Sequence, residues 1–366
     1  MSPGIFLNSV ILAALMGTAG FGQPITLKDY EIIQYITAED AAPENILDLD
    51  NNAAIIMACR EGATRTQLGA RGIAFNASQI KLLEAWRLID ERSDSILFPG
   101  FPIIDPPDMT AIREETQRAA DRIGPRIRAD VDLFTRQLTE IHRERNAYCI
   151  MFSYIVDGLV WQRFEERKLV RKNEVTAATP FWAGEVWALR PRRDFANGTN
   201  SLADKGIAFK IGWCEALIPK MVPFVADWKN LGQMFDDYVA FGRLRDTTAT
   251  RVFAPYNLFD SLGQFTVPVI REESSDSLYS TCSRLGDNIT DEIVATLDLA
   301  RLQEQFHFRD RDQTLVIVYH EFMWDLMNWL EEHKGLSKPR AFAKPQTATP
   351  RDIADLVFIV REKLKH

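Results

Sequence analysis

The chain has 366 residues, of which 46% are hydrophobic, 26% charged and 10% aromatic. This balance is typical of a globular protein and excludes a largely disordered or collagen-like chain. The 43 Lys and Arg residues against 51 Asp and Glu residues give a net charge of −8, so no overall basic field exists to attract nucleic acid. The length predicts two domains and is sufficient for a buried core.

Residues 1–22 form an apolar N-terminal segment without a charged side chain. Its apolar stretch, residues 10–19, is followed by Gly20 and Gly22, which fit the small-residue positions of a signal-peptidase site. The alternatives are a buried first helix and an uncleaved anchor, although residues 5–19 are fewer than the roughly 20 apolar residues that span a bilayer. We therefore expect export to the periplasm or the extracellular space, with no transmembrane span in the mature chain.

The four cysteines are spaced too widely for a zinc ribbon or a thioredoxin-like CxxC pair. They are Cys59, Cys149, Cys214 and Cys282. In an exported protein they could form two disulfides, with three alternative pairings. Cys59 and Cys149 lie within apolar helical patterns, which favours small buried thiols at these two positions. The sequence leaves the disulfide state open.

Residues 23–172 are predicted to form a mainly helical domain. A capping-box-like sequence at 26–29 predicts a short helix carrying Tyr30, Ile33 and Ile36. Further helices and then a β-rich segment are expected at 43–62, 64–70, 78–90 and 93–105. Three helices followed by a hairpin is the order of a winged helix-turn-helix unit, but no signature motif accompanies it here.

Gly124 and Pro125 are predicted to end a helix that begins near residue 108. Beyond them, apolar residues alternate at spacings of three and four, with Arg145 as the single exception, at Ile127, Val131, Phe134, Leu138, Ile141, Tyr148, Phe152, Ile155 and Leu159. This pattern predicts one long helix over 126–169 with a continuous apolar seam. The seam is expected to pair with residues 108–123, as a helical hairpin, or with another copy of the chain as an oligomer.

Residues 173–335 are predicted to form a mixed α/β domain, because the apolar pattern changes to a period of two. Strands and helices are expected at 181–189, 207–213, 228–241, 251–259, 265–270 and 310–335, with a hairpin turn at 260–263. A proline-rich linker at 336–350 carries basic residues and no acid, and a final helix is expected at 351–366. The sequence thus predicts a predominantly helical α+β fold: a winged-helix-like unit, a long helical hairpin, a mixed α/β unit and C-terminal helices.

The known catalytic and nucleotide-binding motifs GxSxG, P-loop, GxGxxG and HExxH are absent, and no cofactor is predicted. The candidate catalytic pair is His320 and Glu321, with Asp325 one helical turn beyond Glu321. An imidazole and two carboxylates could hold a metal ion or transfer a proton. The second histidine of a zinc-protease motif is missing. The favoured interpretation is therefore structural, with His320 partly buried and Glu321 and Asp325 on a solvated face.

Asp157 is a third candidate catalytic residue, because it lies within an almost wholly apolar helical segment. An ionised carboxylate in such surroundings needs a partner or retains its proton. The alternative is that Asp157 and Gly158 face water at an opening of the bundle. The basic run at 190–193 is interpreted as a solvated loop, although it could also meet an anion.

These observations support three hypotheses about function. The first is an exported, non-enzymatic protein that binds an unidentified small ligand or partner protein. The second is a metal-dependent or acid–base hydrolase that uses His320, Glu321 and Asp157. The third is a winged-helix DNA-binding regulator, in which the helix at 78–90 would offer only Lys81 and Arg87 to phosphates; the overall charge argues against nucleic acid as a partner.

Overall fold

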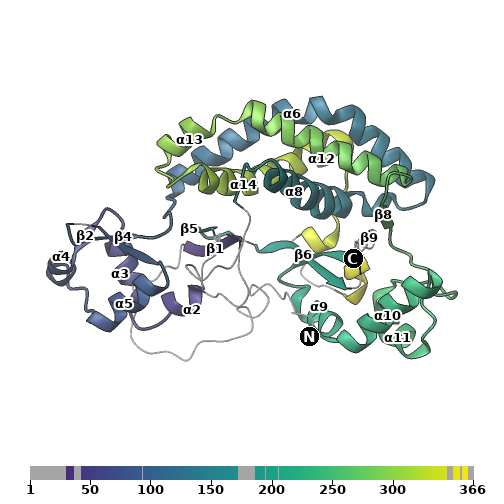
Figure 1. Cartoon of the computed structure of the whole chain (residues 1–366), viewed down its shortest axis with the longest axis horizontal. Helices are drawn as coiled ribbons and strands as arrows, with labels where there is room; N and C mark the ends of the chain where they lie inside the picture. The colour runs from purple at the N-terminus through teal and green to yellow at the C-terminus, as the bar shows by residue number, and fades with distance from the viewer. Residues whose placement is uncertain are drawn as a thin grey trace.

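The computed structural model describes residues 30–36, 43–92, 94–171, 186–193, 195–204, 206–343, 349–354 and 357–361. Helices make up 59% and strands 15% of it, which confirms the predominantly helical α+β fold. The predicted signal peptide at 1–22 lies outside the described residues. Within them, no helix combines the length and apolarity needed to cross a bilayer. Figure 1 shows a small unit at the left, a helical layer along the top and a region of sheet and short helices at the lower right.

The small unit has the winged-helix order that the sequence predicts. Its elements are α2 (Pro43–Leu47), α3 (Asn52–Ala58), β2 (Ala63–Thr64), α4 (Arg65–Ala70), α5 (Ala77–Ala85), β3 (Ile89–Glu91) and β4 (Ile96–Pro99). The strands pair antiparallel in the order β2-β4-β3. Thr64 and Asn76 begin α4 and α5, each completing a capping box with the glutamine three residues later. The unit encloses a hydrophobic core of its own, around Ile55, Leu83 and Leu97.

Residues 30–36 form a strand, β1 (Tyr30–Ile36), and the predicted short helix at this place is wrong. The strand pairs antiparallel with β5 (Val186–Pro191). Its isoleucines are β-branched and favour a strand when a partner strand is present. That partner lies far along the sequence, so local spacing could not reveal it.

Strand β5 contributes side chains to two hydrophobic cores. Trp187 and Leu189 point into the core of the winged-helix-like unit, whereas Val186 and Ala188 point into the main core. Successive side chains of a strand point to opposite faces, which makes this division a consequence of the pleat. The β1–β5 ribbon therefore joins the winged-helix-like unit to the rest of the protein.

The helical layer is built on α6 (Pro106–Glu140), which runs unbroken through Gly124 and Pro125. The predicted break there is wrong. Gly124 instead permits a close approach of α14, because a Cβ at this position would lie 2.4 Å from ring atoms of Trp329. The layer is completed by α12 (Ser277–Thr296), α13 (Leu299–Gln305) and α14 (Arg311–Lys334). The apolar seam of α6 is buried against α12 and α14, and residues 108–123 belong to the same helix rather than to a hairpin partner.

The predicted continuous helix over 126–169 is also wrong, because the chain turns between 141 and 143. His142 has a φ of +56°, a left-handed conformation that ends α6. The chain then continues through η1 (Glu144–Asn146), α7 (Ala147–Cys149), η2 (Ile150–Val160) and α8 (Trp161–Glu166). The element η2 is a π-helix of 11 residues, far longer than the single-turn bulges that are usual for this geometry.

A four-stranded sheet lies beneath the helical layer, with strand order β6-β7-β9-β8. Its strands are β6 (Asn197–Asp204), β7 (Ile207–Cys214), β8 (Val269–Glu272) and β9 (Val357–Arg361). The C-terminal helix predicted over 351–366 is wrong: a short 3₁₀ turn, η5 (Pro350–Ala354), precedes β9. Strand β9 is antiparallel to β7 and parallel to β8, so distant segments of the chain complete one sheet.

Short helices cover one side of this sheet (Figure 1). They are α9 (Ile218–Ala226), α10 (Trp228–Phe241), α11 (Thr247–Phe253) and η3 (Ala254–Tyr256), and η4 (Arg340–Phe342) follows α14. The hairpin predicted around 260–263 is reduced to a single bridge between Phe259 and Phe265, because residues 247–256 are helical. The predicted helix at 228–241 is confirmed as α10.

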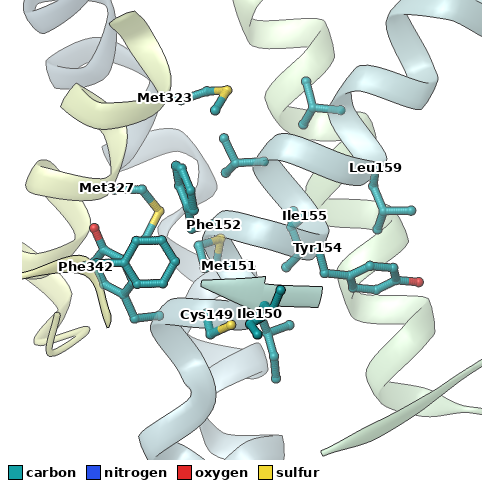
Figure 2. Close-up of a cluster of buried hydrophobic side chains, with 14 of the residues drawn as sticks. Cys149, Ile150, Met151, Phe152, Tyr154, Ile155, Leu159, Met323, Met327 and Phe342 are labelled. Atoms are coloured by element: carbon teal, nitrogen blue, oxygen red, sulfur yellow. The ribbon is translucent and has the colours of Figure 1, made fainter. Parts of the chain in front are cut away.

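The main core surrounds the π-helix η2. Figure 2 shows Met151, Phe152 and Ile155 of η2 facing the side chains of Met323 and Met327. The flexible thioethers of methionine fill the irregular space beside a helix that is wider than an α-helix. All four cysteines are buried, and none forms a disulfide.

Candidate functional site

Four ionisable side chains that the sequence singles out lie on two neighbouring elements. Asp157 lies on η2, whereas His320, Glu321 and Asp325 lie on α14. Asp157 and His320 face each other closely enough for each charge to act on the other's titration. Glu321 and Asp325 have other partners. We define the central site as Asp157 and His320 together with Lys210, which sequence reasoning missed.

The π-helix fixes the position of Asp157. The hydroxyl of Tyr319, buried in α14, donates a 2.5 Å hydrogen bond to the backbone carbonyl of Val156. This contact holds η2 against α14 next to the carboxylate. π-helical segments occur frequently at functional sites, because the wider turn displaces side chains from their α-helical positions.

Asp157 is half-buried, and burial raises the pKa of its carboxyl group, while the charges of Lys210 and His320 counteract the rise. The side chain is therefore neither fully solvated nor enclosed without a partner. Asp157 therefore has the cationic neighbours that a carboxylate in apolar surroundings requires.

His320 is half-buried, and its Nδ1 lies 2.7 Å from the backbone carbonyl of Val316. A carbonyl oxygen only accepts hydrogen bonds, so Nδ1 carries the proton and Nε2 is the basic nitrogen of the neutral ring. Burial lowers the pKa of His320, while the hydrogen bond to Val316 counteracts this. The neutral imidazole, which can accept a proton, is thus the favoured form near pH 7.

Lys210 reaches the same place from strand β7. A Cβ on Gly158 would lie 3.7 Å from the Lys210 ammonium nitrogen, so the glycine leaves space for this side chain beside Asp157. Burial lowers the pKa of Lys210, and the charge of Asp157 counteracts this. The sequence carries a signal for Lys210 that was not used: it is the only charged residue in the apolar run of 207–214.

Aromatic rings surround the imidazole of His320. The ring centroid of Tyr35, on β1, lies 4.9 Å from that of His320, and the Trp161 centroid lies 5.7 Å from it. Burial raises the pKa of Tyr35 to about 12, so its hydroxyl remains protonated at neutral pH. The site thus combines three titratable groups with flat apolar surfaces, a composition typical of small-molecule sites.

Glu321 is buried, with an exposed fraction of 6%, and the solvated face predicted for it is wrong. Its carboxylate accepts a hydrogen bond from Arg190 and another from Nε of Arg113 at 3.2 Å. Arg190 is only 2% exposed, so the interpretation of 190–193 as a solvated loop is also wrong for its first residue. Two guanidinium groups occupy the carboxylate, which makes Glu321 a structural partner of the site rather than a free base.

Asp325 lies one helical turn beyond Glu321 and accepts a 2.5 Å hydrogen bond from Thr116 of α6. Burial raises its pKa to about 6, although the Thr116 hydroxyl counteracts the rise. Glu321 and Asp325 therefore bind different partners instead of converging on one point. Among the described residues, no three His, Cys, Asp or Glu side chains gather closely enough to hold a metal ion.

No protein-family model matches the chain, and the searches of curated proteins and of solved structures found no match. The functional argument therefore rests on the residues of this chain and their contacts.

Proposed function

We propose that the protein binds a small ligand in the central site and that it does so after export. One observation carries the ligand-binding proposal: Asp157, Lys210 and His320 are all half-buried and converge from a π-helix, a strand and an α-helix. Purely structural charges inside a protein are usually fully paired. Here three titratable groups lie together, and no residue that the structure describes forms a hydrogen bond with Nε2 of His320.

The ligand that fits this composition has a polar group and a flat apolar part. Lys210 and Asp157 can hydrogen-bond a carboxylate and an amine, respectively, and the rings of Tyr35 and Trp161 offer surfaces for stacking. Small aromatic zwitterions, such as aromatic amino acids, combine these features.

The test is a thermal-shift screen of the mature chain against aromatic amino acids, their decarboxylated amines and their deaminated acids. We expect a zwitterion to raise Tm, and Lys210→Met and Asp157→Asn each to weaken its binding at least tenfold. Lys220→Met and His333→Gln are the controls. Lys220 is exposed, and His333 makes the same kind of backbone hydrogen bond on α14, 2.9 Å to Trp329, outside the central site. Equal ligand shifts in all variants would contradict the proposal.

Acid–base catalysis by Asp157 and His320 is a second candidate function. The observation in its favour is that the imidazole of His320 and the carboxyl group of Asp157, on the neighbouring helix, lie close enough for each charge to affect the pKa of the other. A panel of ester, amide and glycoside substrates tests it. His320→Gln should abolish any turnover found, whereas His333→Gln should retain it. Turnover that survives His320→Gln would remove this candidate.

Export rests on residues 1–22 alone, which no contact in the structure tests. The N-terminus of the product from a secreting host decides the question. We expect the mature chain to begin after Gly22, and a cytosolic product that still begins with Met1 would contradict export.

A further inference from the structure

A second pocket lies away from the central site, at the end of α14. It has a volume of about 610 Å³, within the range of small-molecule sites. The walls come from the C-terminal parts of α6 and α14, from the turn after α6, from residues 335–340 and from η5. The pocket shares only α14 with the central site, and none of its lining residues belongs to that site, so the pocket is independent of the function proposed above.

The lining of this pocket is strongly basic in a chain of net charge −8. Five cationic side chains line it against two carboxylates, those of Glu144 and Asp352. The cations are Arg145, Lys334, Lys338, Arg340 and Arg351. Residues 335–340, which form part of the wall, contain no Asp or Glu. The local excess of positive charge is therefore a property of this pocket and not of the whole surface.

Two of the five cations have acidic partners outside the pocket. Lys334 pairs with Asp132, and the Lys338 ammonium lies 3.3 Å from Glu331. These pairs hold the two lysines at the end of α14, where their charge also offsets the negative pole of the helix. The two lysines therefore contribute mainly to the shape of the pocket, because their acidic partners already offset part of their charge.

The arginines of the lining determine which kind of anion suits this pocket. Arg351 is exposed and forms no ion pair with any residue that the structure describes. Arg340 lies 3.6 Å from Oδ1 of Asp352, and Oδ2 of the same carboxylate accepts hydrogen bonds from the backbone amide of Thr349 at 2.6 Å and from its hydroxyl at 3.0 Å. Planar guanidinium groups match the oxygens of a phosphate in pairs, which compact ammonium groups do not.

We propose that this pocket binds a small organic phosphate, with its phosphoryl group at Arg351 and Arg340. Inorganic phosphate alone would leave most of the volume empty. Buried Leu336, together with Ala147 and Pro339, offers an apolar wall for the organic part of the ligand. The hydroxyls of Thr135, Thr139 and Ser337 supply further hydrogen bonds.

Isothermal titration of the full mature chain tests the proposal, with AMP and glucose 6-phosphate as probes and with adenosine, glucose and inorganic phosphate for comparison. We expect at least one ester to bind, its unphosphorylated counterpart not to bind, and the affinity to fall as salt rises from 50 to 300 mM. Arg351→Ala should weaken binding at least tenfold. Arg128→Ala, which removes an exposed charge from α6 outside the pocket, should leave it unchanged.

Arg351 and Arg128 are both exposed, so neither substitution should alter Tm in the absence of ligand. A loss of binding can therefore be distinguished from a loss of stability. If neither ester binds, or if an ester and its unphosphorylated counterpart bind equally, the proposal is wrong. Binding that Arg351→Ala and Arg128→Ala weaken to the same extent would show attraction to the general surface and would also overturn it. A negative result here would not contradict the proposal that the central site binds a ligand, because that proposal rests on other residues.

Discussion

Arg190 donates a hydrogen bond to Glu321 in the interior of the protein and thereby joins strand β5 to helix α14. Each member of this pair has a second neighbour of opposite charge: Arg113 lies 3.2 Å from Glu321, and Glu31 lies 3.5 Å from Arg190. Since β5 also supplies Trp187 to the core of the winged-helix-like unit, this ion pair fixes that unit to the helical layer. It also holds the residue next to His320 in place.

We predict that Glu321→Ala destabilises the protein by about 3–5 kcal/mol, because it leaves the Arg190 guanidinium buried without its carboxylate. Urea denaturation followed by far-UV circular dichroism measures the change in the free energy of unfolding. Arg113→Ala should cost less than about 1 kcal/mol, since the Arg113 side chain is half-exposed and its pairing is screened by water.

The double variant Arg190→Met with Glu321→Leu provides the control for this prediction. It should be more stable than either single variant, because no unpaired charge remains in the interior. Additive effects of the two single substitutions would show that Arg190 and Glu321 are not coupled, against the structure.

The raised pKa of Asp325 predicts a stability that depends on pH. Its pKa is about 6 in the folded protein, against about 3.9 for an unfolded chain, so folding favours the protonated form. The stabilising contribution of Asp325 to the free energy of unfolding is therefore fully present below about pH 4 and is lost as the pH rises through 6. Asp325→Asn should stabilise the protein at pH 7.5 by on the order of 1 kcal/mol, with little effect at pH 4.

Urea denaturation at pH 4 and at pH 7.5 checks this prediction, with Asp94→Asn as the control. Asp94 is exposed in the turn between β3 and β4, far from α14, and its replacement should change stability by less than about 0.5 kcal/mol at either pH. Equal effects of Asp325→Asn at both values would mean that Asp325 titrates like a solvated carboxylate.

The sequence predicted elements well wherever the signal is local. The helix that begins after Thr64 was predicted in this way, and so was α14, from the Asp310 cap and Gly335. Two of the errors occur where a distant partner decides the structure. β1 and β9 are strands because β5, β7 and β8 lie beside them. Their local patterns suited a helix equally well.

The candidate site was only partly predictable for the same reason. His320 and Asp157 could be chosen because each is a polar residue in an apolar run. Their proximity depends on the packing of η2 against α14, which no single-helix pattern encodes. Lys210 stood out in its strand by the same criterion. Arg190 did not, because it begins a basic run that resembles a surface loop.

We predict that the winged-helix-like unit does not bind duplex DNA under physiological conditions. Residues 43–105 contain nine Asp and Glu residues against six Lys and Arg residues. Arg65 is paired with Glu91, and α5 exposes Lys81 as its one basic side chain. Affinity for DNA depends on neutralising phosphates, so few contacts are available here. Fluorescence anisotropy with the full chain and a labelled 24-base-pair duplex should show no binding at 150 mM salt and 100 µM protein. Salt-dependent binding that Lys81→Ala weakens would revive the regulator hypothesis.

The contact between Gly124 and Trp329 predicts opposite effects for two glycine substitutions. Gly124→Ala should destabilise the protein by about 1–3 kcal/mol, because the new methyl group would lie 2.4 Å from the indole ring and force α6 and α14 apart. Gly232→Ala should stabilise it by about 0.5–1 kcal/mol, since Gly232 lies within α10, no atom would lie within 4 Å of the new Cβ, and alanine has the higher helix propensity. Thermal denaturation of both variants under one set of conditions measures the difference. A Gly124→Ala protein as stable as the Gly232→Ala protein would mean that α6 and α14 do not pack as closely as the structure shows.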